Sequence, residues 1–202
     1  MLEYKGLRIE TSDLVYAPAE DSFLMESMID PGLSGKDNAR VLDIGTGTGF
    51  LGIAAGTKRN VHEVIFTDIN PDAVDTARRN AERNSEMVVS KCNFVMGDLF
   101  SGIEGKFDLI IFNAPYLKGE GGEEVLSEAW EGGKEGVELS IRFLKESKAF
   151  LKERGRILIS ASSLANLQML TGSVSMLGFA IEAERKVHIF FEDIFAFLLR
   201  AA

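Results

Sequence analysis

From residue 40 onward, short apolar runs alternate with segments that have the apolar spacing of helices. A strand followed by a helix and then by a parallel strand is the unit of sheets that are covered on both faces. The pattern therefore predicts an α/β fold with a mostly parallel sheet. The strands are expected at 41–44, 64–67, 93–96, 107–112 and 156–160, and the helices between and after them at 50–58, 71–84, 137–151 and 165–177.

The most continuously apolar run, 107–112, should form the centre of this sheet because a strand covered on both faces needs apolar residues at every position. Residues 180–199 alternate around Glu192-Asp193 and predict an antiparallel hairpin at one edge. Five strands and the hairpin make a seven-stranded sheet.

The amino-terminal residues lack this alternation. Residues 7–9 can form a short strand, and a helix should follow it, with Pro18 in its first turn and Pro31-Gly32 at its end. We therefore expect a single domain over residues 1–202, in which 1–36 form a cover over a core of 37–202.

Composition limits the classes of function. The chain has 31 acidic and 22 basic residues, so its net charge is −9, which argues against a grip on nucleic acid phosphates but leaves a local basic patch open. The single cysteine, Cys92, excludes an internal disulfide, and His62 and His188 are too few for a zinc cluster, so we expect no metal site. No apolar run approaches the roughly 18 residues of a membrane span, and no signal peptide opens the chain, which predicts a cytoplasmic protein.

A glycine-rich turn, 43–49, follows the first core strand and precedes a helix. Glycines allow a tight turn and a close approach of the backbone to a ligand, although glycine-rich turns are common. The spacing is Gly-x-Gly-x-Gly rather than the Gly-x-Gly-x-x-Gly of dinucleotide enzymes, and Asp43 stands before it. A carboxylate there repels a pyrophosphate and attracts an ammonium group, which argues against a dehydrogenase.

Two more acids follow the next two strands. Asp68 can accept both hydroxyls of a ribose, and Asp98 can hold an adenine amino group, in the crevice where such sheets bind ligands. Taken separately, Asp68 could cap the helix that begins after Asn70, and Asp98 could be a turn residue. Together with Asp43 they suit a ligand with an amino acid end, a ribose and an adenine but no phosphate, and S-adenosylmethionine fits that description.

The sequence Asn113-Ala114-Pro115-Tyr116 ends the central strand. The Asn113 side-chain carbonyl and the Ala114 backbone carbonyl offer two acceptors for a planar NH₂ group, because Pro115 favours extended geometry at Ala114 and Tyr116 can cover the flat face. Holding both hydrogens would fix such a nitrogen in line with a methyl donor. The bland alternative is a strand-end asparagine followed by a turn proline.

These features resemble the class I S-adenosylmethionine-dependent methyltransferases with a Rossmann-like sheet. Within them, the chain is similar to the compact archaeal and eukaryotic branch of the HemK-type protein-glutamine methyltransferases, although Ala114 replaces a proline that many relatives carry. The resemblance rests on residues 15–22, 43–49, 67–71, 97–99, 113–116 and 129–136.

The resemblance implies that the chain methylates the glutamine in the Gly-Gly-Gln loop of a class I peptide release factor. Its reaction motif would be Asn113, Ala114, Pro115 and Tyr116, in which Asn113 holds the substrate amide. Its residues against S-adenosylmethionine would be Tyr16, Pro18, Ser22, Asp43, Gly45, Gly47, Asp68, Ile69, Asp98, Leu99 and Asn113.

The resemblance also implies a small zinc-binding activator subunit, for which the strand 93–96 at a sheet edge offers a place. An ordinary exposed edge is the competing interpretation. Residues 118–136, with Trp130, are either a lid over the target peptide or a mere loop, and Trp130 either contacts substrate or covers the sheet end.

The sequence is also compatible with two other functions. An RNA or DNA amino-methyltransferase, acting on adenine N6 or guanine N2, would share the cofactor turn and the Asn113 motif, and a basic surface beside Asn113 would favour it. A non-catalytic binding module with the same fold is a third possibility, although the intact acids and Asn113 argue against it.

Overall fold

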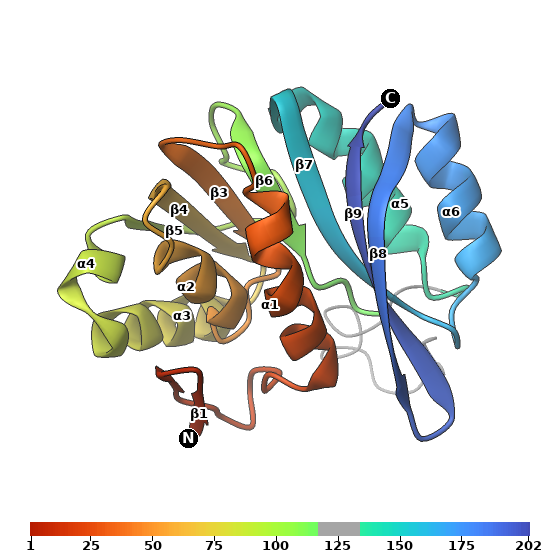
Figure 1. Ribbon diagram of the computed structural model, residues 1–202. Coiled ribbons are helices and arrows are strands. Elements are labelled where there is room, and N and C mark those ends of the chain that lie inside the picture. The colour runs from red at the N-terminus through yellow and green to blue at the C-terminus, as the bar shows by residue number, and fades with distance from the viewer. Residues whose placement is uncertain (117–133) are drawn as a thin grey trace.

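The computed structural model describes residues 1–116 and 134–202, which form a seven-stranded sheet with helices on both faces and a separate two-stranded sheet (Figure 1). The strands are β1 (Leu2–Tyr4), β2 (Leu7–Ile9), β3 (Ala39–Ile44), β4 (Val61–Asp68), β5 (Cys92–Met96), β6 (Phe107–Phe112), β7 (Leu151–Ser162), β8 (Phe179–Ile189) and β9 (Glu192–Ala201). The helices are α1 (Glu20–Gly32), α2 (Phe50–Gly56), α3 (Pro71–Asn84), α4 (Glu86–Val89), α5 (Glu138–Ser147) and α6 (Leu167–Met176), and a 3-10 turn spans Lys148–Phe150.

The strand order of the large sheet is β5-β4-β3-β6-β7-β9-β8. The first five strands are parallel, and β9 runs antiparallel to both β7 and β8. The predicted α/β fold, its mostly parallel seven-stranded sheet and its terminal hairpin are therefore confirmed. The central position of β6 is also confirmed, and every residue of this strand is buried.

Alternate residues of the central strands enter two separate cores. Val41 and Leu109 pack with α1, α2 and α3 on one face, and Leu42 and Ile110 pack with α5 and α6 on the other. The register pairs Leu42 with Ile110, so neighbouring strands direct matching positions to the same face. Because β3, β4 and β6 are parallel, their carboxyl ends meet at one edge of the sheet, and the chain leaves each of them there.

Several element boundaries differ from the sequence prediction. The short strand at 7–9 has an unpredicted partner, β1, across a two-residue turn in which Lys5 and Gly6 both have positive φ, as a type I′ hairpin requires. Pro18 was expected in the first turn of the following helix, but α1 begins two residues later, at Glu20.

The predicted helix 137–151 was too long. It ends at Ser147, and Leu151 already belongs to β7, which begins five residues before the predicted strand. The polar residues 152–154 and Gly155 hide this extension of the strand from an apolar pattern.

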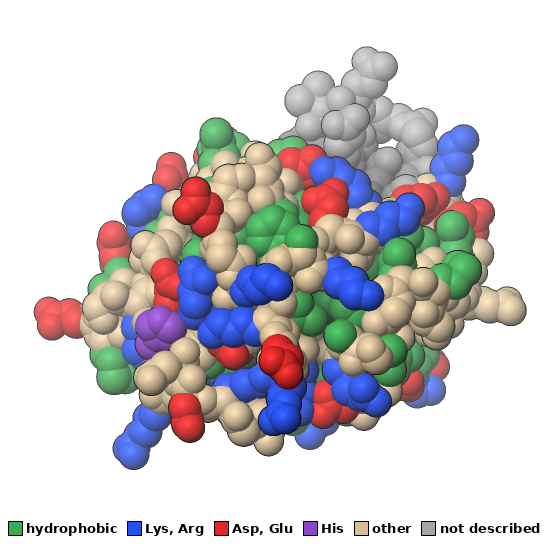
Figure 2. All heavy atoms as spheres, turned by 90° about the horizontal axis from the view of Figure 1, so that it is seen from above, with side chains coloured by type: hydrophobic (Ala, Val, Ile, Leu, Met, Phe, Trp, Pro, Cys, Tyr) green, Lys and Arg blue, Asp and Glu red, His purple; other side chains and the backbone are tan. Residues whose placement is uncertain are grey.

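Figure 2 shows the face at the amino ends of the parallel strands, opposite the edge where their carboxyl ends meet. Basic and acidic side chains are mixed on this face. Three ion pairs join residues in the first half of their strands, namely Arg40–Glu63, Lys152–Asp108 and Arg156–Glu182. Among the described residues, no helix is both long and apolar enough to cross a membrane.

Candidate functional site

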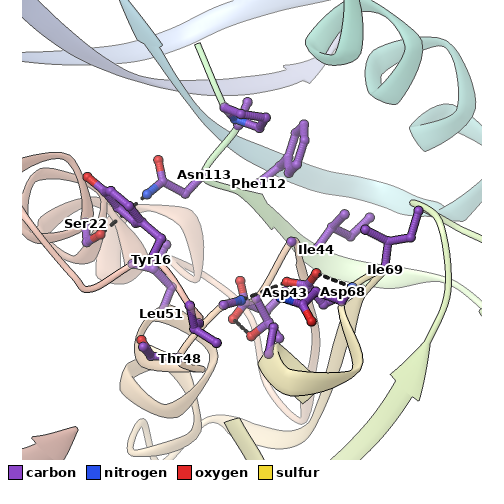
Figure 3. Close-up of a pocket in the computed structure, with 18 of the residues that line it drawn as sticks. Tyr16, Ser22, Asp43, Ile44, Thr48, Leu51, Asp68, Ile69, Phe112 and Asn113 are labelled. Carbon is purple, nitrogen blue, oxygen red and sulfur yellow. Dashed lines mark hydrogen bonds between the residues drawn. The ribbon is translucent and has the colours of Figure 1, made fainter. Parts of the chain in front are cut away.

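A cavity of about 600 Å³ opens at the carboxyl ends of β3, β4 and β6 (Figure 3). Its volume falls within the roughly 300–1,000 Å³ of small-molecule sites. The structure brings every predicted site residue to this cavity. The lining includes Tyr16, Pro18, Ser22, Asp43, Gly45, Gly47, Asp68, Ile69, Asp98, Leu99, Asn113, Ala114, Pro115 and Tyr116.

The turn between β3 and α2 lines part of the cavity. Gly45, Gly47 and Gly49 all have positive φ, between 53° and 81°, a conformation that side chains other than glycine rarely adopt. At Gly45, a Cβ atom would also lie 3.3 Å from the Phe112 ring. The three glycines are therefore required by the path of the turn, which exposes backbone to the cavity.

Asp43 is fixed at the tip of β3 and is only 2% exposed. Its Oδ2 atom accepts hydrogen bonds from the Thr46 hydroxyl at 2.6 Å and from the backbone N–H of Gly52 at 2.9 Å. Burial raises the pKa of the Asp43 carboxyl to about 7, although these two hydrogen bonds act in the opposite direction. A cation placed beside Asp43 would favour its ionised form.

Asp68 lies at the tip of β4 and closes the other side of the turn. One carboxylate oxygen accepts from the backbone N–H of Gly47 at 3.0 Å, and the other accepts from that of Asn70 at 2.9 Å. Burial raises the pKa of Asp68, and these backbone donors oppose the rise. The cap of α3 is supplied by the side chain of Asn70, which accepts from the backbone N–H of Asp72, so capping by Asp68 is not required.

Asp98 follows β5 and is more exposed than the other two acids. It forms an ion pair of 2.6 Å with Arg142 of α5, which also contacts Glu146. The next residue, Leu99, is buried with a positive φ of 48°, which is uncommon for a leucine. Asp98 thus reaches the cavity together with a basic partner that its sequence position did not reveal.

Asn113 at the end of β6 is held on both sides of its carboxamide. Its Nδ2 atom donates to Asp21 Oδ2 at 3.0 Å and to Ser22 Oγ at 3.4 Å, and its Oδ1 atom accepts from the Ser160 hydroxyl at 2.6 Å. Figure 3 shows this side chain directed toward Ser22 and Tyr16. The strand end thus presents an oriented amide rather than a solvent-exposed one.

Two tyrosines also converge on Asp21. The hydroxyls of Tyr16 and Tyr116 donate to Asp21 Oδ2 at 3.3 Å and 3.4 Å. Burial, and next the charge of Asp21, raise the pKa of both phenols, so both hydroxyls remain protonated and able to donate at neutral pH. The amino-terminal cover is thereby joined to the Asn113 motif.

The cavity is strongly acidic. Among the described residues, its lining contains five acids (Asp21, Asp43, Asp68, Asp98 and Glu192) and a single base, Arg142. This balance disfavours a pyrophosphate or a nucleic acid backbone and suits a cationic ligand. The basic surface beside Asn113 that a nucleic-acid enzyme would need is not found on the described lining.

Sequence reasoning missed four participants, namely Asp21, Ser160, Arg142 and Glu192. Asp21 stands directly before Ser22 in the segment 15–22, so its neighbourhood gave a signal. The other three lie in helix or strand patterns without a motif of their own. The predicted lid 118–136 lies outside the described residues except for 134–136, and Trp130 lies outside them entirely. In the part of the chain that is described, no group of three or more His, Cys, Asp and Glu side chains could hold a metal ion.

The known proteins that are similar to this chain include methyltransferases. Residues 21–184 match the methyltransferase small domain family. A protein of Methanocaldococcus jannaschii that carries the provisional name of protein N5-glutamine methyltransferase is 36% identical over 198 residues, which are 96% of this chain and 95% of that protein. The release factor glutamine methyltransferase of Agrobacterium fabrum is 34% identical over 120 residues, which are 57% of this chain and 41% of that enzyme.

Among solved structures, the chain resembles one in the Mtq2–Trm112 complex of E. cuniculi, which is responsible for methylation of the translation termination factor eRF1. The TM-score is 0.67 at 22% identity, and the match covers 94% of this chain and 99% of that one. This similarity shows a shared fold.

Proposed function

Because the chain belongs to the methyltransferase small domain family, we propose that it transfers a methyl group from S-adenosylmethionine to the side-chain amide of a glutamine in a class I peptide release factor. The observation that carries this proposal is the convergence of Asp43, Asp68 and Asn113 on one acidic cavity. The names of the relatives from M. jannaschii and A. fabrum support glutamine as the acceptor.

The residues present fit S-adenosylmethionine. When bound, this cofactor supplies an electrophilic methyl group on a sulfonium, and it carries an ammonium, a ribose and an adenine. In the proposed arrangement Asp43 binds the ammonium group. Asp68 accepts hydrogen bonds from the ribose hydroxyls, and Asp98 accepts one from the adenine amino group. An acidic cavity of about 600 Å³ supports this assignment.

The acceptor amide would lie against Asn113. The lone pair of an amide nitrogen is delocalised, so the nitrogen attacks poorly unless it is positioned. The Asn113 carbonyl would accept one N–H, the Ala114 backbone carbonyl would accept the other, and Tyr116 would cover the flat face. As the nitrogen forms its bond to the methyl carbon, the bond between that carbon and the sulfonium sulfur would break, and the nitrogen would release one of these protons to solvent during or after the transfer. Asn113 is neutral and acts here by positioning, not as a base.

A tritium-methyl transfer assay tests the proposal. The release factor, its variant in which the Gly-Gly-Gln glutamine is replaced by alanine, and total RNA should be offered side by side. We expect label on the release factor, none on its variant and none on RNA. Label on RNA alone would favour an amino-methyltransferase that acts on nucleic acids. The cytoplasmic location of the chain stays a prediction.

A small partner subunit is a second part of the proposal. Among the described strands, β5 pairs only with β4, and Met96 at its end is 65% exposed, so this edge can accept another chain. The Trm112 subunit in the complex of E. cuniculi supports such a partner. The family resemblance implies that the partner of this chain binds zinc. Copurification of a small subunit with the chain, and the loss of that subunit in Met96→Glu, would test whether the β5 edge binds a partner.

A further inference from the structure

Asp21 is a buried cavity acid that accepts mostly from side chains, whereas Asp68 accepts from backbone N–H groups. Asp21 lies in the first turn of α1 and is 4% exposed. One of its oxygens accepts from the backbone N–H and the hydroxyl of Ser22, and the other accepts from Tyr16, Tyr116 and Asn113. These donors are all neutral, and no ion pair of the described residues includes Asp21.

The contacts of Asn113 show that Asp21 determines the orientation of the Asn113 carboxamide. An ionised carboxylate only accepts hydrogen bonds, so the side of the carboxamide that faces Asp21 must be its NH₂ group. A hydroxyl can donate or accept, so Ser160 on the other side would tolerate either orientation of the amide. Asp21 is therefore the contact that discriminates between the two orientations. The oxygen of Asn113 keeps a second lone pair beyond the one that Ser160 uses.

We propose that Asp21 is a positioning residue, which fixes the Asn113 carboxamide so that its oxygen, and not its NH₂ group, meets the N–H of the methyl acceptor. The inference rests on the proposed function, because a flipped amide would place a donor against the donors of the acceptor nitrogen. It adds a residue 92 positions away in the sequence to the reaction motif.

Asp21→Asn tests this role with almost no change of shape. The asparagine can offer its own NH₂ group, which permits Asn113 to flip. We expect kcat to fall about 100-fold, as a misplaced reacting group does, while the calorimetric Kd for S-adenosylmethionine changes by less than about threefold. A kcat within about threefold of the wild-type value, or a Kd that worsens as much as kcat, would overturn the proposal.

Asp108→Asn is the matched control. Asp108 is a buried acid near the start of β6, at the opposite end of this strand from Asn113, and it accepts from Lys152 and from the backbone of Arg40. We expect this variant to lose thermal stability and to keep the wild-type kcat. An equal fall of kcat in both variants would mean that loss of any buried acid slows turnover, and would overturn the specific role of Asp21.

A measurement without substrate separates this inference from the proposed function. In protein with ¹⁵N-labelled asparagine side chains, the Asn113 NH₂ resonances are assigned by their loss in Asn113→Ala. We expect these resonances to move in Asp21→Asn and to stay in place in Asp108→Asn, whose side chain contacts Arg40 and Lys152 at the other end of β6. Unmoved resonances in Asp21→Asn would overturn the inference even if the wild-type chain methylates no release factor.

Ser160→Ala also decides the matter if Asp21→Asn does not fold. Because Asp21 would still orient the amide, kcat should fall by no more than about tenfold, as expected for the loss of one hydrogen bond to the Asn113 oxygen. A larger fall in kcat would assign the orientation to Ser160 instead of Asp21.

Discussion

The two ends of the cavity are built in different ways. At the end proposed for the methyl donor, Asp43 and Asp68 accept from backbone N–H groups that lie between 2 and 21 residues away in the sequence. At the end proposed for the acceptor, Asn113 contacts side chains of α1 and β7 that lie 92 and 47 residues away. The donor end is therefore set by one strand-turn-helix unit and its neighbour, and the acceptor end depends on the packing of the whole fold.

The largest expected effect breaks the acceptor end alone. Asn113→Ala removes the carbonyl that would hold the acceptor nitrogen, so we expect kcat to fall by about 10³-fold or more. The Kd for S-adenosylmethionine should change by less than about threefold, because Asp43 and Asp68 are untouched. Methyl-transfer kinetics and calorimetry measure the two quantities. A variant with normal turnover would remove Asn113 from the reaction.

Breaking the donor end should have the opposite signature. Asp68→Ala removes a charged acceptor proposed for the ribose hydroxyls, and hydrogen bonds to charged groups contribute about 1.5–3 kcal/mol, so the Kd should rise by about 30-fold. At saturating S-adenosylmethionine, kcat should recover to near its original value. Asp68→Asn, which keeps the shape, serves as the comparison. An unchanged Kd in both variants would contradict the assignment.

The same contrast explains how much the sequence predicts. The order of strands and helices and the residues of the glycine turn follow from local patterns, so β6 and α3 were predicted with their observed bounds. The three acids Asp43, Asp68 and Asp98 could be read from strand ends, whereas Tyr16, Pro18 and Ser22 came from the family resemblance alone. Ser160 lies inside the apolar strand β7, and its contact with Asn113 arises only when β7 pairs with β6. No periodicity marks such a contact.

A smaller effect at the donor end is the dependence of S-adenosylmethionine affinity on pH. Burial raises the pKa of Asp43 to about 7, and an ammonium group binds the ionised form. Affinity for S-adenosylmethionine should therefore increase as pH rises from roughly 5.5 to 7.5, by at most about tenfold per unit, and then level off. Asp43→Asn should remove this dependence, which calorimetry at several pH values would measure. An affinity that falls with rising pH would contradict the role of Asp43.

The smallest expected effect concerns Asp98. This acid follows a strand, like Asp43 and Asp68, but it also contacts a side chain that is distant in the sequence, as Asn113 does. The Asp98–Arg142 pair is about half exposed, and such pairs contribute under about 1 kcal/mol. Arg142→Ala should therefore change both the free energy of unfolding and the Kd for S-adenosylmethionine only slightly, the latter by less than about threefold. Asp98→Ala should raise that Kd by about fivefold if its carboxylate accepts the adenine amino group. Equal effects of the two variants would show that the ion pair acts as one unit, and Asp98 would then belong with the side chains that depend on tertiary packing.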